Sequence, residues 1–316
     1  MKHILNLVLC GMLTACTANV TPVSPTQLPS TQTIPAPAKI SNYQIRITGS
    51  SQTPKPTAII LRTLTPSATE LPNATSVDPE GWKNLPVIPT VDASIRAIYE
   101  YGQSLGNDPH AFSIFGDCQS RPGAFFGVFE TDPSLVESFS PELQVTVAYF
   151  QDSFNRESPT AQDGTTPGAL LWTQWHHGDY GCSFAETPVA CELRIHHPSF
   201  VIIQIGTHFE SRNTEYLRKV ILQLMDAGVV PILATKADNR EKDERINRDM
   251  SVLAAEYDLP LWNFWAAVSD LPNRGLFVMK GRELQGPIYL TDEAAVIHRM
   301  TGLAALNAVW RVATGK

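Results

Sequence analysis

The chain has 316 residues, and 43% of them are hydrophobic, which is enough for a sizeable buried core in one large domain or two small ones. The formal net charge of -7 argues against a general nucleic-acid-binding protein, because binding to phosphates requires a basic surface and no basic run is visible. Only 17% of the residues are charged, and the composition is that of a globular protein with one biased end.

The N-terminus has the features of an export signal. Lys2 and His3 precede an apolar run over residues 4–13, which is too short for a membrane-spanning helix. The residues L-T-A-C that end at Cys16 resemble the lipobox of bacterial lipoproteins. This resemblance implies removal of residues 1–15, lipid on the Cys16 sulfur and an extracytoplasmic protein anchored to the cell membrane or envelope. An ordinary signal peptide is the alternative.

The segment 16–90 is rich in Pro, Thr and Ser, as in the runs 21–26 and 63–67. Such a composition does not bury enough apolar surface to offset the entropy lost on ordering, which predicts a disordered tether. A coil of this length extends over roughly 45–50 Å root-mean-square. The tether would therefore hold the folded part away from the membrane.

Residues 91–316 change to apolar runs that alternate with amphipathic segments. The run 200–205 is typical of a strand covered on both faces, and further strands are predicted at 111–115, 229–235 and 260–264. Apolar residues at helical spacing follow the strands. This alternation predicts an α/β fold, a doubly wound parallel sheet with helices on both faces in three layers.

Three loops at the carboxyl ends of predicted strands carry polar side chains, at 116–118, 206–208 and 236–239. In open sheets of this class, ligands bind at the carboxyl ends of the strands. These loops therefore mark the predicted site. Lys236 and Asp238 are candidates for ligand contact there, whereas Asp243 and Glu244 fit the start of a helix.

Two of these loops resemble motifs of the SGNH, or GDSL, hydrolase superfamily. The residues F-G-D-C-Q-S around Cys118 are similar to its G-D-S block, with cysteine in place of the nucleophilic serine, and Q-I-G-T-H-F around His208 is similar to its G-T-N-D block. The resemblance extends from about residue 111 to the C-terminus and implies a hydrolase of esters or acyl groups that needs no cofactor. The oxyanion or cleft residues that it implies are Gly116, Asp117, Gly206, Thr207 and Tyr289.

The chain departs from the family pattern at the last block, where the family has D-G-x-H-L with the aspartate and histidine of its triad. This chain reads G-P-I-Y-L-T, so Gly286 replaces the aspartate and Tyr289 the histidine. Glycine cannot orient a base, and a phenol is a poor base at neutral pH. The glycine of the second block is not assigned by the sequence, and Gly164, Gly168 and Gly178 are candidates.

Cys118 has two interpretations. As a nucleophile it requires a thiol pKa lowered by a neighbouring histidine or a helix end, and otherwise it is an inert cysteine in a protein that has lost activity. The resemblance places His208 close to Cys118, so His208 is a hypothesised base or oxyanion donor for it. A histidine that only hydrogen-bonds at the start of its loop is the alternative.

Cys182 and Cys191 lie close together in an exported chain, which favours a disulfide between them over reduced thiols. The histidine pairs 176–177 and 196–197 do not indicate a metal site, because adjacent side chains diverge, and exposed loops are the predicted positions. Trp172 and Trp175 favour packing, with an aromatic surface for a sugar or a peptide as the alternative.

The sequence thus leaves two functions open. One is a membrane-anchored ester or acyl hydrolase with a degraded triad, in which Cys118 attacks and His208 assists. The other is a non-catalytic descendant that binds a glycan, peptide or lipid in the strand-end cleft. The expected partners are the membrane, through lipidated Cys16, and an envelope carbohydrate or lipid.

Overall fold

The computed structural model describes residues 80–316. The predicted signal peptide, Cys16 and the tether as far as residue 79 lie outside the described residues. Within residues 80–316, no helix is both long enough and apolar enough to cross a membrane.

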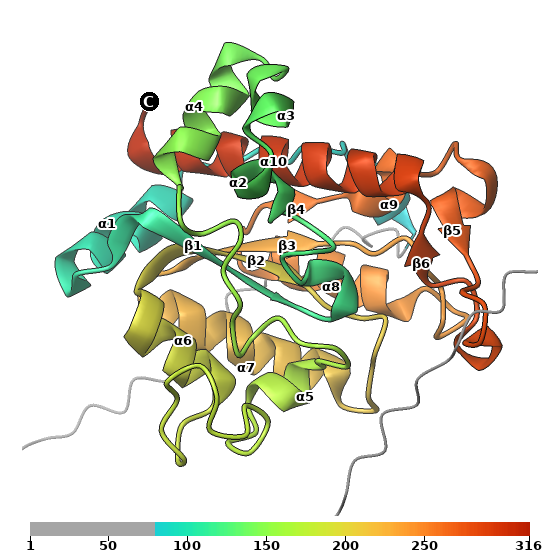
Figure 1. Ribbon diagram of the computed structural model, residues 1–316. Coiled ribbons are helices and arrows are strands. Elements are labelled where there is room, and N and C mark those ends of the chain that lie inside the picture. Colours follow the sequence, from blue (N-terminus) through green and yellow to red (C-terminus); the bar gives the residue numbers. More distant parts are fainter. Residues whose placement is uncertain (1–79) are drawn as a thin grey trace, which may run out of the picture. The chain divides into compact units, whose positions relative to one another are not determined.

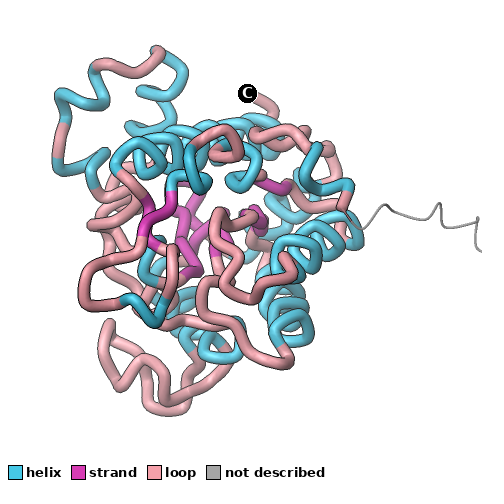
Figure 2. The backbone as a smooth tube through the Cα atoms, turned by 90° about the vertical axis from the view of Figure 1, so that its right-hand side faces the viewer, coloured by secondary structure: helices cyan, strands magenta, loops and turns pink. Residues whose placement is uncertain are grey.

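A four-stranded parallel sheet forms the centre of the domain, with the order β1-β2-β3-β4. Its strands are β1 (Asp108–Gly116), β2 (Pro198–Gln204), β3 (Val230–Ala234) and β4 (Leu261–Trp262). Figures 1 and 2 show this sheet enclosed by helices on both faces. The predicted α/β class with a parallel, doubly covered sheet is confirmed.

Two helical layers cover the sheet. The helices α6 (Pro188–His196), α7 (Asn213–Asp226) and α8 (Arg245–Glu256) pack on one face, and α1 (Ile95–Leu105) and α10 (Asp292–Thr314) pack on the other. In Figure 1, α10 crosses above the sheet while α6 and α7 lie below it. The helices that directly precede β2, β3 and β4 thus supply one layer, and the other layer contains the helices before and after the sheet together with short helices between β1 and β2.

Alternate residues of each strand enter opposite cores, which explains the continuous apolar runs in the sequence. On β2, Phe200 and Ile202 pack in the core beneath α10 with Leu306. Val201 and Ile203, between them, pack in the core against the other helical layer. All four of these strand residues are fully buried.

The other described elements are short. They are η1 (Gly81–Asn84), η2 (Cys118–Ser120), α2 (Val128–Thr131), α3 (Pro133–Glu137), α4 (Pro141–Tyr149), α5 (Pro167–Leu170), α9 (Phe264–Ala267), η3 (Pro272–Gly275), η4 (Glu283–Gln285) and the antiparallel pair β5 (Leu276–Phe277) and β6 (Tyr289–Leu290).

The outer edge of β1 pairs with a segment that the sequence did not single out. A parallel bridge joins Gly116 to Ala161, and the Gly116 N–H donates to the Thr160 carbonyl at 2.9 Å. β2 lies on the opposite side of β1. The segment at Ala161 and the strand β2 therefore flank β1 on opposite sides. In sheets of this class, ligands bind at such a switch point, at the carboxyl end of the strand.

The folded domain begins earlier than the predicted boundary at residue 91. Trp82 is 3% exposed, and its ring lies 5.1 Å from the ring of Trp265 in an edge-on contact. The buried Asn263 side chain donates to the carbonyls of Trp82 and Leu85 at 2.9 and 3.0 Å. Residues 80–90 thus pack on the domain and do not belong to a disordered tether, because Trp82 supplies the apolar surface that the rest of the segment lacks.

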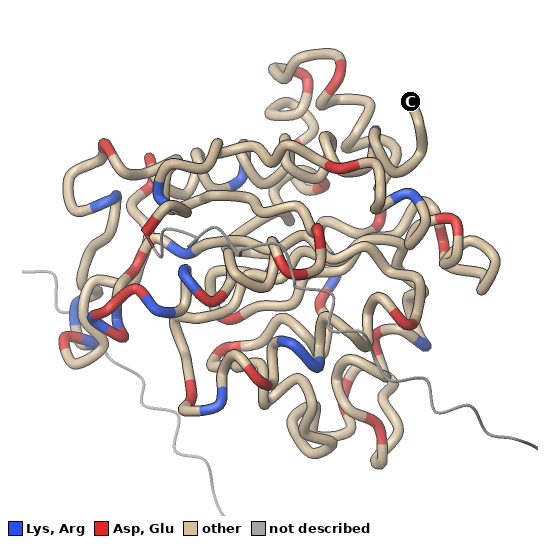
Figure 3. The backbone as a smooth tube through the Cα atoms, turned by 180° about the vertical axis from the view of Figure 1, so that it is seen from behind, with Lys and Arg blue, Asp and Glu red and all other residues tan. Residues whose placement is uncertain are grey.

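The charged residues of the domain are mixed in sign. From behind, Lys and Arg lie beside Asp and Glu along the same segments (Figure 3). Lys83, for example, pairs with both Glu80 and Glu244 at 2.5 Å, and Arg245 pairs with Asp243 at 3.2 Å. Glu244 thus forms ion pairs but makes no side-chain capping hydrogen bond at the start of α8. Asp243 does accept the Arg245 N–H there, as expected at the start of a helix.

Candidate functional site at the carboxyl end of β1

Gly116 ends β1 in a space that admits only glycine. A Cβ atom at this position would lie 2.0 Å from Ser120 Oγ and 2.7 Å from the Gln204 carbonyl oxygen. Asp117 follows in an extended conformation, and its Oδ1 accepts the Gln119 N–H at 3.3 Å. Cys118 is therefore the first residue of a helical turn directly after the strand, in the position where the sequence predicts a nucleophile.

The surroundings of Cys118 oppose formation of a thiolate. Burial raises the pKa of the Cys118 thiol to about 12, and the carboxylates of Asp117 and Asp163 add to this increase. The backbone N–H groups of Cys118 and Gln119 favour the thiolate, but their effect is smaller. At neutral pH the thiol is thus protonated, whereas reactive cysteines lie in electropositive surroundings that lower the pKa.

His208 lies next to Asp117. Its Nδ1 is 3.8 Å from Asp117 Oδ2, and both atoms are buried without a hydrogen-bond partner in residues 80–316. This separation is longer than a hydrogen bond. Across the same described residues, no hydrogen bond joins the Cys118 thiol to a histidine. The structure therefore brings His208 to the aspartate of the G-D-C motif and does not show the hypothesised contact between His208 and Cys118.

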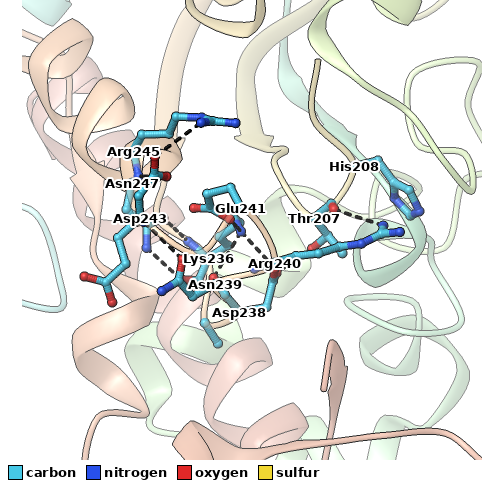
Figure 4. A network of polar contacts seen from close by, with 12 residues as sticks. Thr207, His208, Lys236, Asp238, Asn239, Arg240, Glu241, Asp243, Arg245 and Asn247 are labelled. Atoms are coloured by element: carbon cyan, nitrogen blue, oxygen red, sulfur yellow. Dashed lines mark hydrogen bonds and ion pairs between the residues drawn. The ribbon is translucent and has the colours of Figure 1, made fainter. Parts of the chain in front are cut away.

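A buried polar network fixes the loop that carries His208 (Figure 4). Thr207 Oγ1 donates to Asp238 Oδ2 at 2.7 Å, and Arg240 Nη1 donates to the Thr207 carbonyl at 3.3 Å. Lys236 Nζ pairs with Asp238 at 2.8 Å and with Glu241 at 2.6 Å. Lys236 and Asp238 are only 5% and 2% exposed. These two candidates for ligand contact are therefore buried, and they stabilise the loop that carries His208.

Gly206 gives this loop its sharp turn. Its φ angle is +145°, and a Cβ atom would lie 2.4 Å from Ile246 Cγ2 on α8. A side chain here would strain the backbone and clash with the helix, so the glycine is required for the loop to leave the sheet at this point.

The segment that resembles the family's last block lies beside the G-D-C loop. The Gln119 side-chain amide donates to the Ile288 carbonyl, which joins the two segments. The Tyr289 hydroxyl donates to Gln285 Oε1 at 2.5 Å and accepts from Arg282 at 3.3 Å. The segment thus has the expected position, but Gly286 and Tyr289 supply neither a carboxylate nor an imidazole to Cys118.

The structure distinguishes the three candidate glycines of the second block. Gly164 follows the segment that pairs with the end of β1, so it belongs to the same edge of the sheet. The Gly168 N–H donates to Glu210 Oε1 at 2.7 Å, and the Gly178 N–H donates to His176 Nδ1 at 2.9 Å. The N–H groups of Gly168 and Gly178 are therefore already hydrogen-bonded, and Gly164 remains the candidate for the glycine of the second block.

Two residues of the site gave no signal in the sequence. Asp163 acts on Cys118 from a loop about 45 residues away in sequence.

His298 lies in the helical pattern of α10 and is fully buried against Phe125 and Trp262, and burial lowers its pKa to about 3. Its imidazole contacts the Gln204 side chain, to which Ser120 Oγ donates at 3.3 Å. This neutral histidine supports the floor of the site from within the core.

One histidine of each pair, His177 and His197, is exposed as predicted, and the other is not. His176 is 2% exposed, and its Nε2 lies 3.0 Å from the Glu186 carbonyl. His196 Nε2 lies 3.1 Å from the Phe112 carbonyl of β1, and burial lowers the pKa of this histidine to about 4. Each of these two rings places a nitrogen within hydrogen-bond distance of a backbone carbonyl that would otherwise lack that partner.

The predicted disulfide is confirmed. Cys182 and Cys191 are bonded, with their Cα atoms 5.3 Å apart, and Cys118 is the free cysteine of the described residues.

No family model matches the chain, and no curated protein matches it. Solved structures that resemble it include a GDSL-like lipase from Bacteroides thetaiotaomicron, with 13% identity and a TM-score of 0.38, over 67% of this chain and 95% of that chain. Another is a mutant of an acetyl-xylooligosaccharide esterase from Geobacillus, with 16% identity and a TM-score of 0.40, over 62% of this chain and 93% of that chain.

The Cys118 thiol should have a pKa far above the ordinary value near ~8.5. Its alkylation by iodoacetamide, measured against pH with Cys118→Ala as the blank, should still be rising at pH 9. Asp163→Asn removes a negative charge that opposes the thiolate, so it should lower the pKa and speed alkylation at pH 8. A wild-type pKa at or below ~8.5 would contradict this account of the site.

Proposed function

We propose that this protein binds its ligand at the carboxyl end of β1 without chemical turnover, on a hydrolase-type α/β fold. The observation that carries the proposal is the environment of Cys118, where burial and two carboxylates hold the thiol protonated. A serine or cysteine hydrolase needs a base that takes the nucleophile's proton. The segment around Gly286 and Tyr289 supplies none.

Several features support a retained binding site. Gly116 and Gly206 keep the two loops in a tight geometry that a side chain would disrupt. The network around Lys236 fixes the His208 loop. Asp117 Oδ2 and His208 Nδ1 are buried polar atoms without partners in the described domain. Such atoms are costly unless a polar group satisfies them, which fits a site that receives a polar ligand group.

The pair formed by Asp117 and His208 favours a second candidate, a cysteine-dependent ester hydrolase. A carboxylate that is hydrogen-bonded to Nδ1 orients an imidazole so that Nε2 can act on a nucleophile, and Asp117 Oδ2 lies 3.8 Å from His208 Nδ1. In that reaction Cys118 Sγ would attack the ester carbonyl, and His208 would accept the thiol proton and pass it to the leaving alcohol. Water would then release the acid and restore the thiol.

The proposal places the site outside the cytoplasm, attached to a membrane through lipid on Cys16. The L-T-A-C sequence that ends at Cys16, after a short apolar run, supports this placement. The expected ligand is a carbohydrate or lipid of the cell envelope, because the tether would keep the domain within reach of that layer.

Esterase assays separate the two candidates. With p-nitrophenyl acetate and p-nitrophenyl butyrate, wild type and Cys118→Ala should hydrolyse the substrates at rates within about twofold of each other, because the thiol is protonated and lacks a base. Cys118→Ser should show no gain. A loss of at least about tenfold in both Cys118→Ala and His208→Ala would establish the hydrolase and overturn the binding proposal.

The anchor is tested by detergent-phase separation of the protein expressed in bacteria with its own signal. The wild type should enter the detergent phase and incorporate labelled fatty acid, and Cys16→Ser should incorporate none because it has no thiol to receive lipid. Cys10→Ser is the matched control and should behave as the wild type, since it lies in the cleaved segment. A wild type found in the aqueous phase would contradict the anchor.

A further inference from the structure

A cavity of about 530 Å³ opens beside the start of α7. Its walls come from three segments: Trp172 and Trp175 follow α5, Tyr216 lies in the first turn of α7, and Glu210 comes from the strand-end loop that carries His208. Figure 1 shows α5 beside α7 at the lower edge of the domain. The cavity thus lies on the side of the molecule where the parallel strands end.

Trp172 is the exposed aromatic wall of this cavity, and Trp175 and Tyr216 are half-buried. Trp172 is 52% exposed, and its ring centroid is 6.5 Å from that of Trp175, with an angle of 41° between the planes. Trp175 Nε1 is buried and has no hydrogen-bond partner in residues 80–316. Tryptophan has a large apolar surface, so leaving half of it in water forgoes much hydrophobic free energy. The exposed ring of Trp172 is therefore better explained by a ligand surface than by core packing.

Glu210 supplies a fixed acceptor at the edge of this aromatic surface. Its Oε1 accepts the Gly168 N–H at 2.7 Å, and its Oε2 accepts the Thr166 hydroxyl at 3.1 Å. A Cβ atom on Gly168 would lie 2.6 Å from Oε1, so the glycine makes room for the carboxylate. A carboxylate has about four acceptor positions, and two are used here, which leaves acceptors for ligand hydroxyl groups.

We infer that this aromatic cavity binds a neutral sugar ring of an oligosaccharide. A pyranose has an apolar C–H face that stacks on tryptophan or tyrosine, and hydroxyl groups at its edge that donate to a carboxylate such as Glu210. An acyl chain would gain nothing from the carboxylate, and an anionic sugar group placed beside Glu210 would be repelled by it. Arg212 and Lys219 lie over the Tyr216 ring at 5.1 and 5.5 Å, so the free stacking surface is that of Trp172. The combination of Trp172 and Glu210 therefore fits a neutral sugar better than a lipid.

The cavity continues toward Cys118. Trp175 also lines a neighbouring cavity of about 230 Å³, together with Arg121 and Asp163. Asp163 is one of the carboxylates that act on the Cys118 thiol. A glycan stacked on Trp172 would thus extend along Trp175 to the end of β1. This step rests on the proposed function, because it makes the glycan the ligand of the strand-end site.

Calorimetric titration of the full chain with cellohexaose, xylohexaose and chitohexaose tests the inference. At least one of these neutral hexasaccharides should bind, and hexagalacturonate, which is anionic, should not. Trp172→Ala should weaken the binding by about tenfold or more, because it removes the exposed stacking surface. Tyr101→Ala removes a 50% exposed aromatic ring on α1 and is the matched control, with an expected change below about twofold.

The results separate this inference from the proposed function. Absence of binding for all three neutral sugars at millimolar concentration, or a loss below about twofold in a folded Trp172→Ala, would overturn the sugar site. Cysteine-dependent esterase activity would overturn binding without turnover while the sugar site stood. Glycan binding that is lost in Trp172→Ala and weakened by Cys118→Trp, which fills the strand-end site, supports both.

Discussion

The site depends on the interactions of one buried group, the carboxylate of Asp117. Its Oδ1 accepts the Gln119 N–H and so sets the turn that presents Cys118. Its Oδ2 lies near His208, and its charge opposes ionisation of the Cys118 thiol. One carboxylate thus positions the cysteine, lies beside the histidine and disfavours the thiolate. This combination explains how the architecture of a nucleophile site persists where the nucleophile itself is held protonated.

The rest of the fold makes this arrangement rigid. Gly116 lies between Ser120 and Gln204 at distances that no side chain tolerates, and the buried Gln204 continues the contacts to His298 on α10. The loop of His208 rests on the ion pairs of Lys236. A site supported from the core in this way is pre-organised, which lowers the entropy lost when a ligand binds. The same rigidity limits any movement of His208 toward the thiol.

The sequence predicted the parts of this protein that local pattern determines. The apolar run 200–205 gave a buried strand, and the short spacing of Cys182 and Cys191 gave the disulfide. It could not give the position of Asp163, because that carboxylate reaches Cys118 only through the return of a long connection to the edge of β1. The packing of Trp82 was missed for a different reason. The Pro-, Thr- and Ser-rich segment before it suggested a tether, and the contact with the Trp265 ring shows why Trp82 is ordered.

The central claim is that the Cys118 thiol does not form an acyl intermediate. Mass spectrometric peptide mapping after incubation with p-nitrophenyl acetate at neutral pH tests it directly, since a nucleophilic cysteine would carry the acetyl group. The account predicts an unmodified Cys118 peptide in both the wild type and His208→Ala. An acetyl group on Cys118 in the wild type that is absent in His208→Ala would contradict it.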